Sequence, residues 1–391
     1  MKIKFYFICL CFFLLTGCYN YNELNTLAIA TGMSINYKDD HYEVSLLIAN
    51  SKQAQVSSKE GESQSIVYEG KGSTISEALR EIDVISPKSI YIGHLSFIVV
   101  SESLAKQGLI DSLDYLLRDP ESIKRFYLIM ARNAEAKDIL EIVSPLESFP
   151  AQSISTAISF SRESQAVTST IPYSSFIENL VKKGAEPILA TIELKGNAKK
   201  GKSAESLQSS TPKAYLQLST LALFKKDKLV HITNEEESKG INVINNNIGE
   251  LLLNCHCSGG KAEIEVQNLK TSKKVSIQDG KPHILVKVKG KGSLQESTCK
   301  LDLEQEKNIL SLEKKANEEV KRLMEKAIDV TKKFETDSFG FGNLIYKFHP
   351  KIFKPLEENW NEEGFKELDI SYDVDIRLEF KGSTESGIKE N

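Results

Sequence analysis

Apolar runs alternate with amphipathic stretches over the first 145 residues of the chain. Runs rich in β-branched and aromatic residues predict strands, and stretches with apolar residues three or four positions apart predict helices. The helices are expected to follow the capping residues Thr74, Ser101 and Asn133. This alternation favours an α/β or α+β layered domain. The strands are expected at 42–49, 66–68, 91–100 and 125–131, and the helices at 74–85, 101–117 and 134–143.

The second half of the chain combines short strand-like segments with one long helical pattern. Apolar residues gather on one side of 304–334, which predicts a long amphipathic helix. Large apolar residues occupy every second position from Ile370 to Phe380, which predicts a half-buried strand at 369–380. The fold class expected is therefore α+β, with mixed sheets packed by helices. Further strands are expected at 188–194, 214–224, 229–232, 264–266 and 284–289, and further helical segments at 343–350 and 360–365.

Polar and proline-rich stretches divide the chain. Residues 51–65 lack an apolar run and 195–212 are rich in Lys, Ser and Gly, so both predict loops or linkers. The segment 145–190 contains four prolines and two helix-like stretches, 151–160 and 173–183, and is a candidate small lobe. A chain of 391 residues suits two or three domains of about 100–200 residues each. The organisation expected is a signal peptide at 1–17, an N-terminal region at 18–200 and a C-terminal α+β domain at 201–391.

The N-terminus has the pattern of a secretion signal. Lys2 and Lys4 precede an uncharged apolar run over 5–15, which is shorter than the roughly 20 residues of a spanning helix. Leu15-Thr16-Gly17-Cys18 then has the form of a lipobox, because two small residues precede a cysteine whose thiol can form a thioether to diacylglycerol. A buried N-terminal strand with a chance cysteine is the weaker interpretation. We expect cleavage before Cys18, which becomes an S-diacylglycerol cysteine with an N-palmitoyl group.

Composition and charge narrow the class of protein. With 40% hydrophobic and 27% charged residues, the chain is an ordinary globular protein rather than a rod, a disordered chain or a polytopic membrane protein. The net charge of −4, which becomes −6 when Lys2 and Lys4 are removed, argues against a general nucleic-acid binder.

Three cysteines remain in the mature chain beside Cys18. In a strand, Cys255 and Cys257 would point to one face and His256 to the other, so the three cannot share one zinc ion, which wants four ligands. We expect buried or free thiols, with a disulfide to Cys299 as the alternative.

No motif in the sequence places a catalytic site. Residues 196–203 satisfy the pattern G-x-x-x-x-G-K-S, but the Ser-rich stretch that follows, ended by Pro212, predicts a surface loop and not a phosphate-binding helix. The glycines of 339–342 predict a turn between two helices. His94 lies in an apolar run and is expected to be a buried core or interface residue. We therefore expect no enzymatic activity, no cofactor and no metal.

Several segments in order resemble one known family. The first segment begins at Cys18 and continues with an aromatic residue, a polar cluster and Glu23-Leu24. Its aromatic residue is Tyr19, where members of this family most often have Trp. The chain resembles the Ger(x)C family of lipoproteins, the C subunits of spore germinant receptors. The matching segments are 18–32, 87–121, 136–140, 222–230, 237–240 and 337–342, followed by Pro350, Trp360, Phe365 and the final alternating strand.

The resemblance implies a three-domain α+β fold held on the outer face of the spore inner membrane. It also implies assembly with two integral membrane partners, an A subunit and a B subunit similar to amino-acid transporters, in a complex that senses small nutrients and triggers germination. It transfers no catalytic residue and no ligand site to this subunit. The function expected is a non-enzymatic, lipid-anchored receptor subunit. Two alternatives remain, a lipid-anchored extracytoplasmic solute-binding protein that captures a nutrient itself, and an envelope hydrolase.

Overall fold

The fold was analysed in a computed structural model of the chain. The signal peptide expected at 1–17, Cys18, almost all of the loop expected at 51–65, and Phe380 lie outside the described residues. The residues described are 23–50, 65–118, 124–144, 146–147, 150–164, 166–169, 171–203, 206, 209–257, 259–299 and 305–379.

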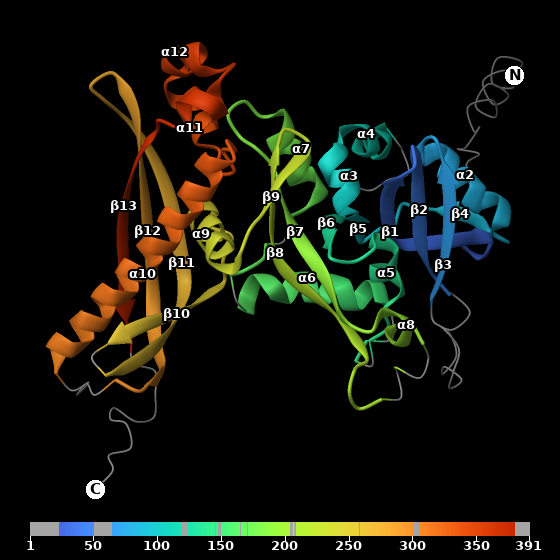
Figure 1. The fold of residues 1–391 in the computed structure, drawn as a ribbon, viewed down its shortest axis with the longest axis horizontal. Coiled ribbons are helices and arrows are strands. Elements are labelled where there is room, and N and C mark those ends of the chain that lie inside the picture. Colours follow the sequence, from blue (N-terminus) through green and yellow to red (C-terminus); the bar gives the residue numbers. More distant parts are fainter. Residues whose placement is uncertain are drawn as a thin grey trace, which may run out of the picture.

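Within these residues, nine strands form one large mixed sheet (Figure 1). Its order is β3-β2-β1-β5-β6-β7-β8-β9, and β4 pairs with the start of β1. The pairs β1–β4, β1–β5, β5–β6 and β6–β7 are parallel, and the pairs β1–β2, β2–β3, β7–β8 and β8–β9 are antiparallel. The strands are β1 Leu27–Lys38, β2 His41–Ala49, β3 Ser65–Gly72, β4 Ser89–Tyr91, β5 Phe97–Val100, β6 Tyr127–Arg132, β7 Ile188–Gly196, β8 Ala214–Lys225 and β9 Lys228–Ile232.

Helices cover both faces of this sheet, which explains why its central strands are apolar throughout. All four residues of β5 are buried, and they alternate between two cores: Phe97 and Val99 face one, Ile98 and Val100 the other. The helices α2 Ile75–Ile85, α3 Glu102–Gln107, α4 Ile110–Arg118 and α7 Tyr173–Val181 pack on the second of these faces. The helices α5 Ala136–Glu141 and α6 Pro150–Ser164 pack on the first. Both helices expected within 145–190 therefore lie against the large sheet.

The capping residue predicted for the first helix is correct. The Thr74 hydroxyl accepts a hydrogen bond of 3.1 Å from the Glu77 backbone N–H. In a capping box the Glu77 carboxylate would accept a hydrogen bond from the N–H of the capping residue Thr74. It accepts instead from the backbone N–H of Ser73, one residue earlier, at 2.8 Å.

Two predicted elements are each split in the structure. The helix expected at 101–117 is interrupted by Gly108, whose φ of 135° is not helical, and continues as α4. The Leu109 and Ile110 N–H groups instead donate to Asp227, from the turn between β8 and β9. The strand expected at 91–100 breaks into β4 and β5, and His94 lies exposed in the turn between them, with its ring against Tyr91. The expectation that His94 is a core residue was wrong, and its place at an interface stays a prediction.

A second mixed sheet of four strands forms the other end of the molecule (Figure 1). Its order is β10-β11-β12-β13, where β12 and β13 are parallel and the other pairs antiparallel. The long helix α10 Glu306–Lys333 lies against this sheet as its amphipathic pattern predicted, with Leu312, Ala316 and Val320 in the core. Two mixed sheets with helices packed on them confirm the predicted α+β class. The strands are β10 Glu250–Cys257, β11 Gly260–Gln278, β12 Lys281–Ser297 and β13 Asp369–Leu378.

Short helices join the two sheets. The helix α9 Glu235–Asn245, which the hydrophobic pattern did not indicate, packs against α10 and begins at Asn234 with a complete capping box. After α10, Gly340 adopts a left-handed conformation (φ 68°), which confirms the predicted turn between two helices. The chain continues through α11 Phe341–Phe348 and α12 Pro350–Phe353 to a single helical turn at Trp360–Gly364.

Candidate functional site

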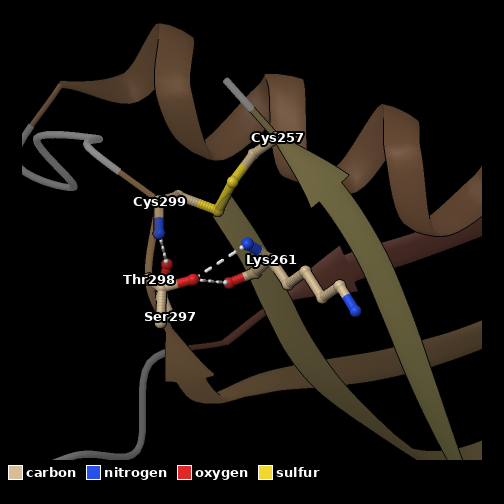
Figure 2. Close-up of a disulfide and its surroundings, with 5 residues drawn as sticks. All are labelled: Cys257, Lys261, Ser297, Thr298 and Cys299. Atoms are coloured by element: carbon tan, nitrogen blue, oxygen red, sulfur yellow. Dashed lines mark hydrogen bonds between the residues drawn. A yellow bond between two sulfur atoms is a disulfide. The ribbon is translucent and has the colours of Figure 1, made fainter. Parts of the chain in front are cut away.

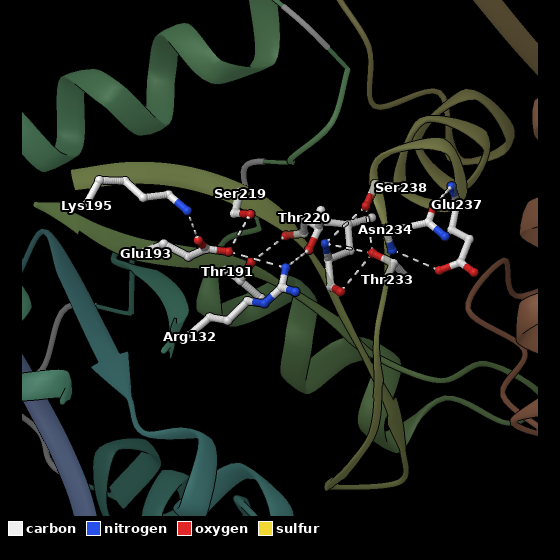
Figure 3. A network of polar contacts seen from close by, with 11 residues as sticks. Arg132, Thr191, Glu193, Lys195, Ser219, Thr220, Thr233, Asn234, Glu237 and Ser238 are labelled. Carbon is white, nitrogen blue, oxygen red and sulfur yellow. Dashed lines mark hydrogen bonds and ion pairs between the residues drawn. The ribbon is translucent and has the colours of Figure 1, made fainter. Parts of the chain in front are cut away.

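A polar groove of about 430 Å³ runs along the outer strands of the large sheet, and Figure 3 shows its network. At its centre the Glu193 carboxylate of β7 accepts a hydrogen bond of 3.0 Å from the Ser219 hydroxyl and pairs with Arg132 at 3.3 Å and with Lys195. Burial would raise the pKa of Glu193, but these partners outweigh it and hold the pKa below its usual value. The groove is lined by Arg132, Glu193, Lys195, Gln217, Ser219, Thr220, His231, Ile232, Thr233, Asn234, Glu235 and Glu237.

The other end of the polar groove joins β8 and β9 to α9 (Figure 3). The Thr233 hydroxyl donates to the Leu221 carbonyl at 2.9 Å and lies 2.6 Å from the Ser238 hydroxyl. The Leu221 N–H donates to both hydroxyls. His231 lies 3.1 Å from Glu237 and stacks on the Phe334 ring at 4.2 Å. Because these polar groups engage one another, the groove has the character of a structural joint and not of an acid–base catalytic site.

A second cavity, which we call the lysine cavity, has a volume of about 480 Å³ and lies between α7, β11 and the segment 338–348. The partly buried Lys273 ammonium donates to the Phe339 carbonyl at 2.7 Å and to Asn245 Oδ1 at 3.0 Å, and it lies 5.6 Å from the centre of the Phe341 ring. Burial lowers the pKa of Lys273 to about 8; Asp337 opposes this shift and Lys182 adds to it. An ammonium group has three donors, so among the described residues one N–H remains available to a ligand.

Glu186 lies on the wall of the lysine cavity. Its carboxylate accepts hydrogen bonds from the Asn361 amide at 2.6 Å and from the Lys226 backbone N–H at 2.5 Å. Burial nevertheless raises the pKa of Glu186 to about 7. The sequence does not single out Glu186 or Lys273, because each is one charged residue among many and the cavity is assembled from separate segments spread between residues 171 and 348.

The pattern over 196–203 does not form a phosphate site. The helix that follows β7 is α8 Ala198–Gly201, only four residues long and capped by Asn197. The Lys202 ammonium pairs with Asp138 and Glu141 of α5, so the lysine that would meet a phosphate is already neutralised. This arrangement agrees with the surface loop expected from the sequence.

A disulfide joins Cys257 at the end of β10 to Cys299, which follows β12 (Figure 2). The Cα atoms are 5.8 Å apart. Beside the bond, the Thr298 backbone N–H donates to the Lys261 carbonyl at 2.9 Å, and the Lys261 N–H donates to the Thr298 hydroxyl at 3.0 Å. Cys255, two residues earlier, is a buried free thiol. The expectation of free thiols was therefore wrong for Cys257 and Cys299, and the alternative was right. The pairing depends on the register of the β11–β12 hairpin, which no local sequence signal reports.

Two further observations concern the part of the chain that the structure describes. It contains no group of three or more His, Cys, Asp or Glu side chains arranged to hold a metal ion. None of its helices combines the length and apolar character needed to cross a membrane. Cys18, the predicted lipidation site, lies outside this part of the chain.

Comparisons with known proteins agree along nearly the whole chain. A model of the spore germination protein N-terminal domain matches residues 20–194, and a model of the spore germination B3/GerAC-like C-terminal region matches residues 219–382. Spore germination protein KC of Bacillus subtilis (strain 168) is 27% identical over 96% of this chain and 94% of that protein. Spore germination protein B3 of the same organism is 25% identical over 93% of this chain and 94% of its own length.

A solved structure shares the fold. The crystal structure of the GerBC protein matches 92% of this chain and 99% of that chain with a TM-score of 0.54 and 19% sequence identity. The resemblance drawn from the ordered sequence segments is thereby confirmed. The chain belongs to the Ger(x)C family of spore germination proteins, a family of receptor C subunits.

Proposed function

We propose that this protein is a non-enzymatic, lipid-anchored subunit of a spore germinant receptor. It acts with integral membrane A and B subunits on the outer face of the spore inner membrane, in a complex that senses small nutrients. The observation that carries the proposal is family membership over residues 20–194 and 219–382, combined with the lipobox that ends at Cys18.

The anchor is the part of the proposal that rests on a single residue. Two or three acyl chains on Cys18 would hold the protein stably at a membrane, whereas one chain binds only marginally. Spores that carry Cys18→Ala in place of the parent protein provide the test. We expect the variant to leave the membrane fraction and nutrient-triggered germination to weaken. Normal localisation and normal germination together would contradict the anchor.

The polar groove does not offer the catalytic arrangement that the alternative, an envelope hydrolase, would need. Glu193, the most buried carboxylate there, already has three partners, and no nucleophile stands beside an unengaged base among the residues that line the groove. The purified soluble part of the chain is therefore expected to leave cell-wall substrates intact. Hydrolysis that follows the protein through purification would instead favour the envelope hydrolase.

The partnership with A and B subunits is tested by co-purification from detergent-solubilised spore membranes. An affinity tag at the C-terminus should recover both membrane subunits with the wild-type chain. Recovery of the tagged chain alone, under conditions in which a tagged A subunit brings down its B subunit, would contradict the assembly.

A second candidate function, capture of a nutrient by this chain itself, is favoured by the lysine cavity. Its spare ammonium donor suits an anionic group such as a carboxylate. Calorimetry of the soluble chain against amino acids and sugars tests this function. Lys274→Met, a change at the exposed neighbour on β11, is the matched control. Saturable micromolar binding that is lost in Lys273→Met but kept in Lys274→Met would establish this function. No heat of binding with amino acids or with sugars would eliminate it.

A further inference from the structure

Two adjacent aliphatic side chains are exposed at the end of α2. Val84 is 85% exposed and Ile85 is 53% exposed, although the same helix buries Ile75, Leu79 and Ile82 in the core. Isolated exposed apolar residues are common on protein surfaces, but an adjacent pair needs a reason if it lies beside a membrane anchor. Leu117, at the end of the contacting helix α4, is 42% exposed.

Strand pairing places this pair beside the beginning of the described chain. Leu27 of β1 pairs with Ser89 of β4, four residues after Ile85. The segment between them is fixed: the Asp83 carboxylate accepts from the Ile90 N–H at 3.1 Å, and the Ser86 hydroxyl donates to the Lys88 carbonyl at 2.6 Å. The four residue steps from Ile85 to Ser89 span at most about 14 Å and the five steps from Val84 about 18 Å, so both side chains stay near the first residues of β1.

The proposed anchor brings the same region to the membrane. Five residue steps separate Cys18 from Glu23, where the described chain begins, and they span at most about 18 Å. A lipid on Cys18 therefore keeps Glu23 within that distance of the bilayer surface. β1 begins at Leu27, four residue steps beyond Glu23, so the end of α2 beside it can reach the same surface.

We propose that Val84 and Ile85, together with the exposed Leu117 of the contacting helix α4, form a docking face that inserts into the headgroup region of the bilayer that holds Cys18. The inference rests on the proposed lipid anchor. The occupant of the face is the lipid surface itself. Three aliphatic side chains are too few to bind a membrane alone, but a tether makes the second contact effectively intramolecular. The anchor supplies the attachment and the docking face sets the orientation.

Contact through the docking face would fix which end of the molecule points away from the membrane. The large sheet with α2 and α4 lies toward one end of the long axis of the molecule, and the four-stranded sheet lies at the other (Figure 1). Contact through the end of α2 therefore directs the four-stranded sheet and α10 away from the lipid.

Tryptophan fluorescence tests the docking face. The chain has a single tryptophan, Trp360, which is 2% exposed and gives a constant background. Val84→Trp is placed in the lipidated protein on vesicles of phosphatidylcholine and phosphatidylglycerol, with or without brominated acyl chains. Val181→Trp, at a 76% exposed valine that likewise ends a helix, is the matched control.

Emission from Val84→Trp should shift to the blue and roughly halve with brominated lipid, because interfacial side chains lie about 5–10 Å deep. Emission from Val181→Trp should not change. Equal quenching of both variants, or none at position 84, would overturn the docking face.

Flotation of the vesicles separates this proposal from the anchor. A protein that floats without quenching at position 84 contradicts only the docking face. A protein that does not float contradicts the anchor. The docking face is then tested with an artificial tether: a histidine tag replaces residues 1–17 and binds nickel-chelating lipid in the same vesicles. Quenching at position 84 alone is the expected result there too, and its absence overturns the docking face.

Discussion

The buried Asp337 carboxylate accepts a hydrogen bond of 2.9 Å from the indole Nε1 of Trp360. The same carboxylate accepts from the backbone N–H groups of Phe339, Phe341 and Gly342 at 3.2, 3.1 and 2.7 Å. One side chain thus caps α11 and attaches the helical turn that begins at Trp360. A Cβ on Gly342 would lie 2.5 Å from the indole nitrogen, so the contact also requires glycine there.

Trp360→Phe should lower the free energy of unfolding by about 2–4 kcal/mol, because it removes a buried hydrogen bond to Asp337 and part of a buried ring. Urea unfolding measures the loss. In the Asp337→Asn background the same substitution should cost at least about 0.5 kcal/mol less, since the two residues are coupled. Equal costs in both backgrounds would mean that the tryptophan stabilises only by packing.

Glu186 should make stability depend on pH. Its pKa is raised to about 7, so between about pH 4.5 and 7 the folded chain holds a proton that the unfolded chain has released. Its contribution to stability therefore falls as pH rises through that window, by on the order of 3 kcal/mol. Glu186→Gln should flatten the dependence in urea unfolding at pH 5 and 8. Glu178→Gln, on the same cavity, should follow the parent, and an unchanged slope in Glu186→Gln would contradict the assignment.

The disulfide should stabilise the chain chiefly by closing a loop across a sequence separation of 42 residues. The entropic model gives a loss of about 4 kcal/mol as an upper value when Cys257→Ser and Cys299→Ser are combined. Thermal unfolding with and without reductant measures it, and the double variant should not respond to reductant. Thiol titration of the unfolded, unreduced soluble chain from residue 23 onward should find one thiol, Cys255; three thiols would refute the bond.

Gly240→Ala should destabilise the contact between α9 and α10. A Cβ there would lie 2.0 Å from the Leu323 carbonyl oxygen of α10, which forces the helices apart. We expect a loss of about 1–3 kcal/mol in urea unfolding, typical of an overpacked core. Lys239→Ala, at the preceding position of the same helix, is the matched control and should change stability by less than about 0.5 kcal/mol.

The predictable elements are those whose signal lies within a few residues. The periodicity of α10 and the Thr74 cap of α2 depend on neighbours three to seven positions away, so the sequence reports them directly. The break between α3 and α4 depends on Asp227, which lies 117 residues from Ile110. The Cys257–Cys299 bond depends in the same way on hairpin register.

The candidate sites were less predictable than the fold, for the same reason. The lysine cavity is assembled from distant segments that include β7 and β11, one from each sheet. The Asp337 network joins the turn before α11 to Trp360, 23 residues further along the chain, and neither periodicity nor a capping pattern reports a contact at that separation. The sequence did place the Asp337–Gly342 segment and Trp360 among the family segments, without a reason for them. The hydrogen bond between Asp337 and Trp360 supplies one.

The antiparallel pairing of β7 with β8 joins the two family regions within one sheet. An expression fragment that stops between these strands would leave the backbone of β7 open along one side, although six of its nine residues are buried. An apolar strand with an open edge recruits other chains. The two regions are therefore best produced and crystallised as one piece, and a chimaera that swaps either region between relatives has to carry a matched β7–β8 pair with it.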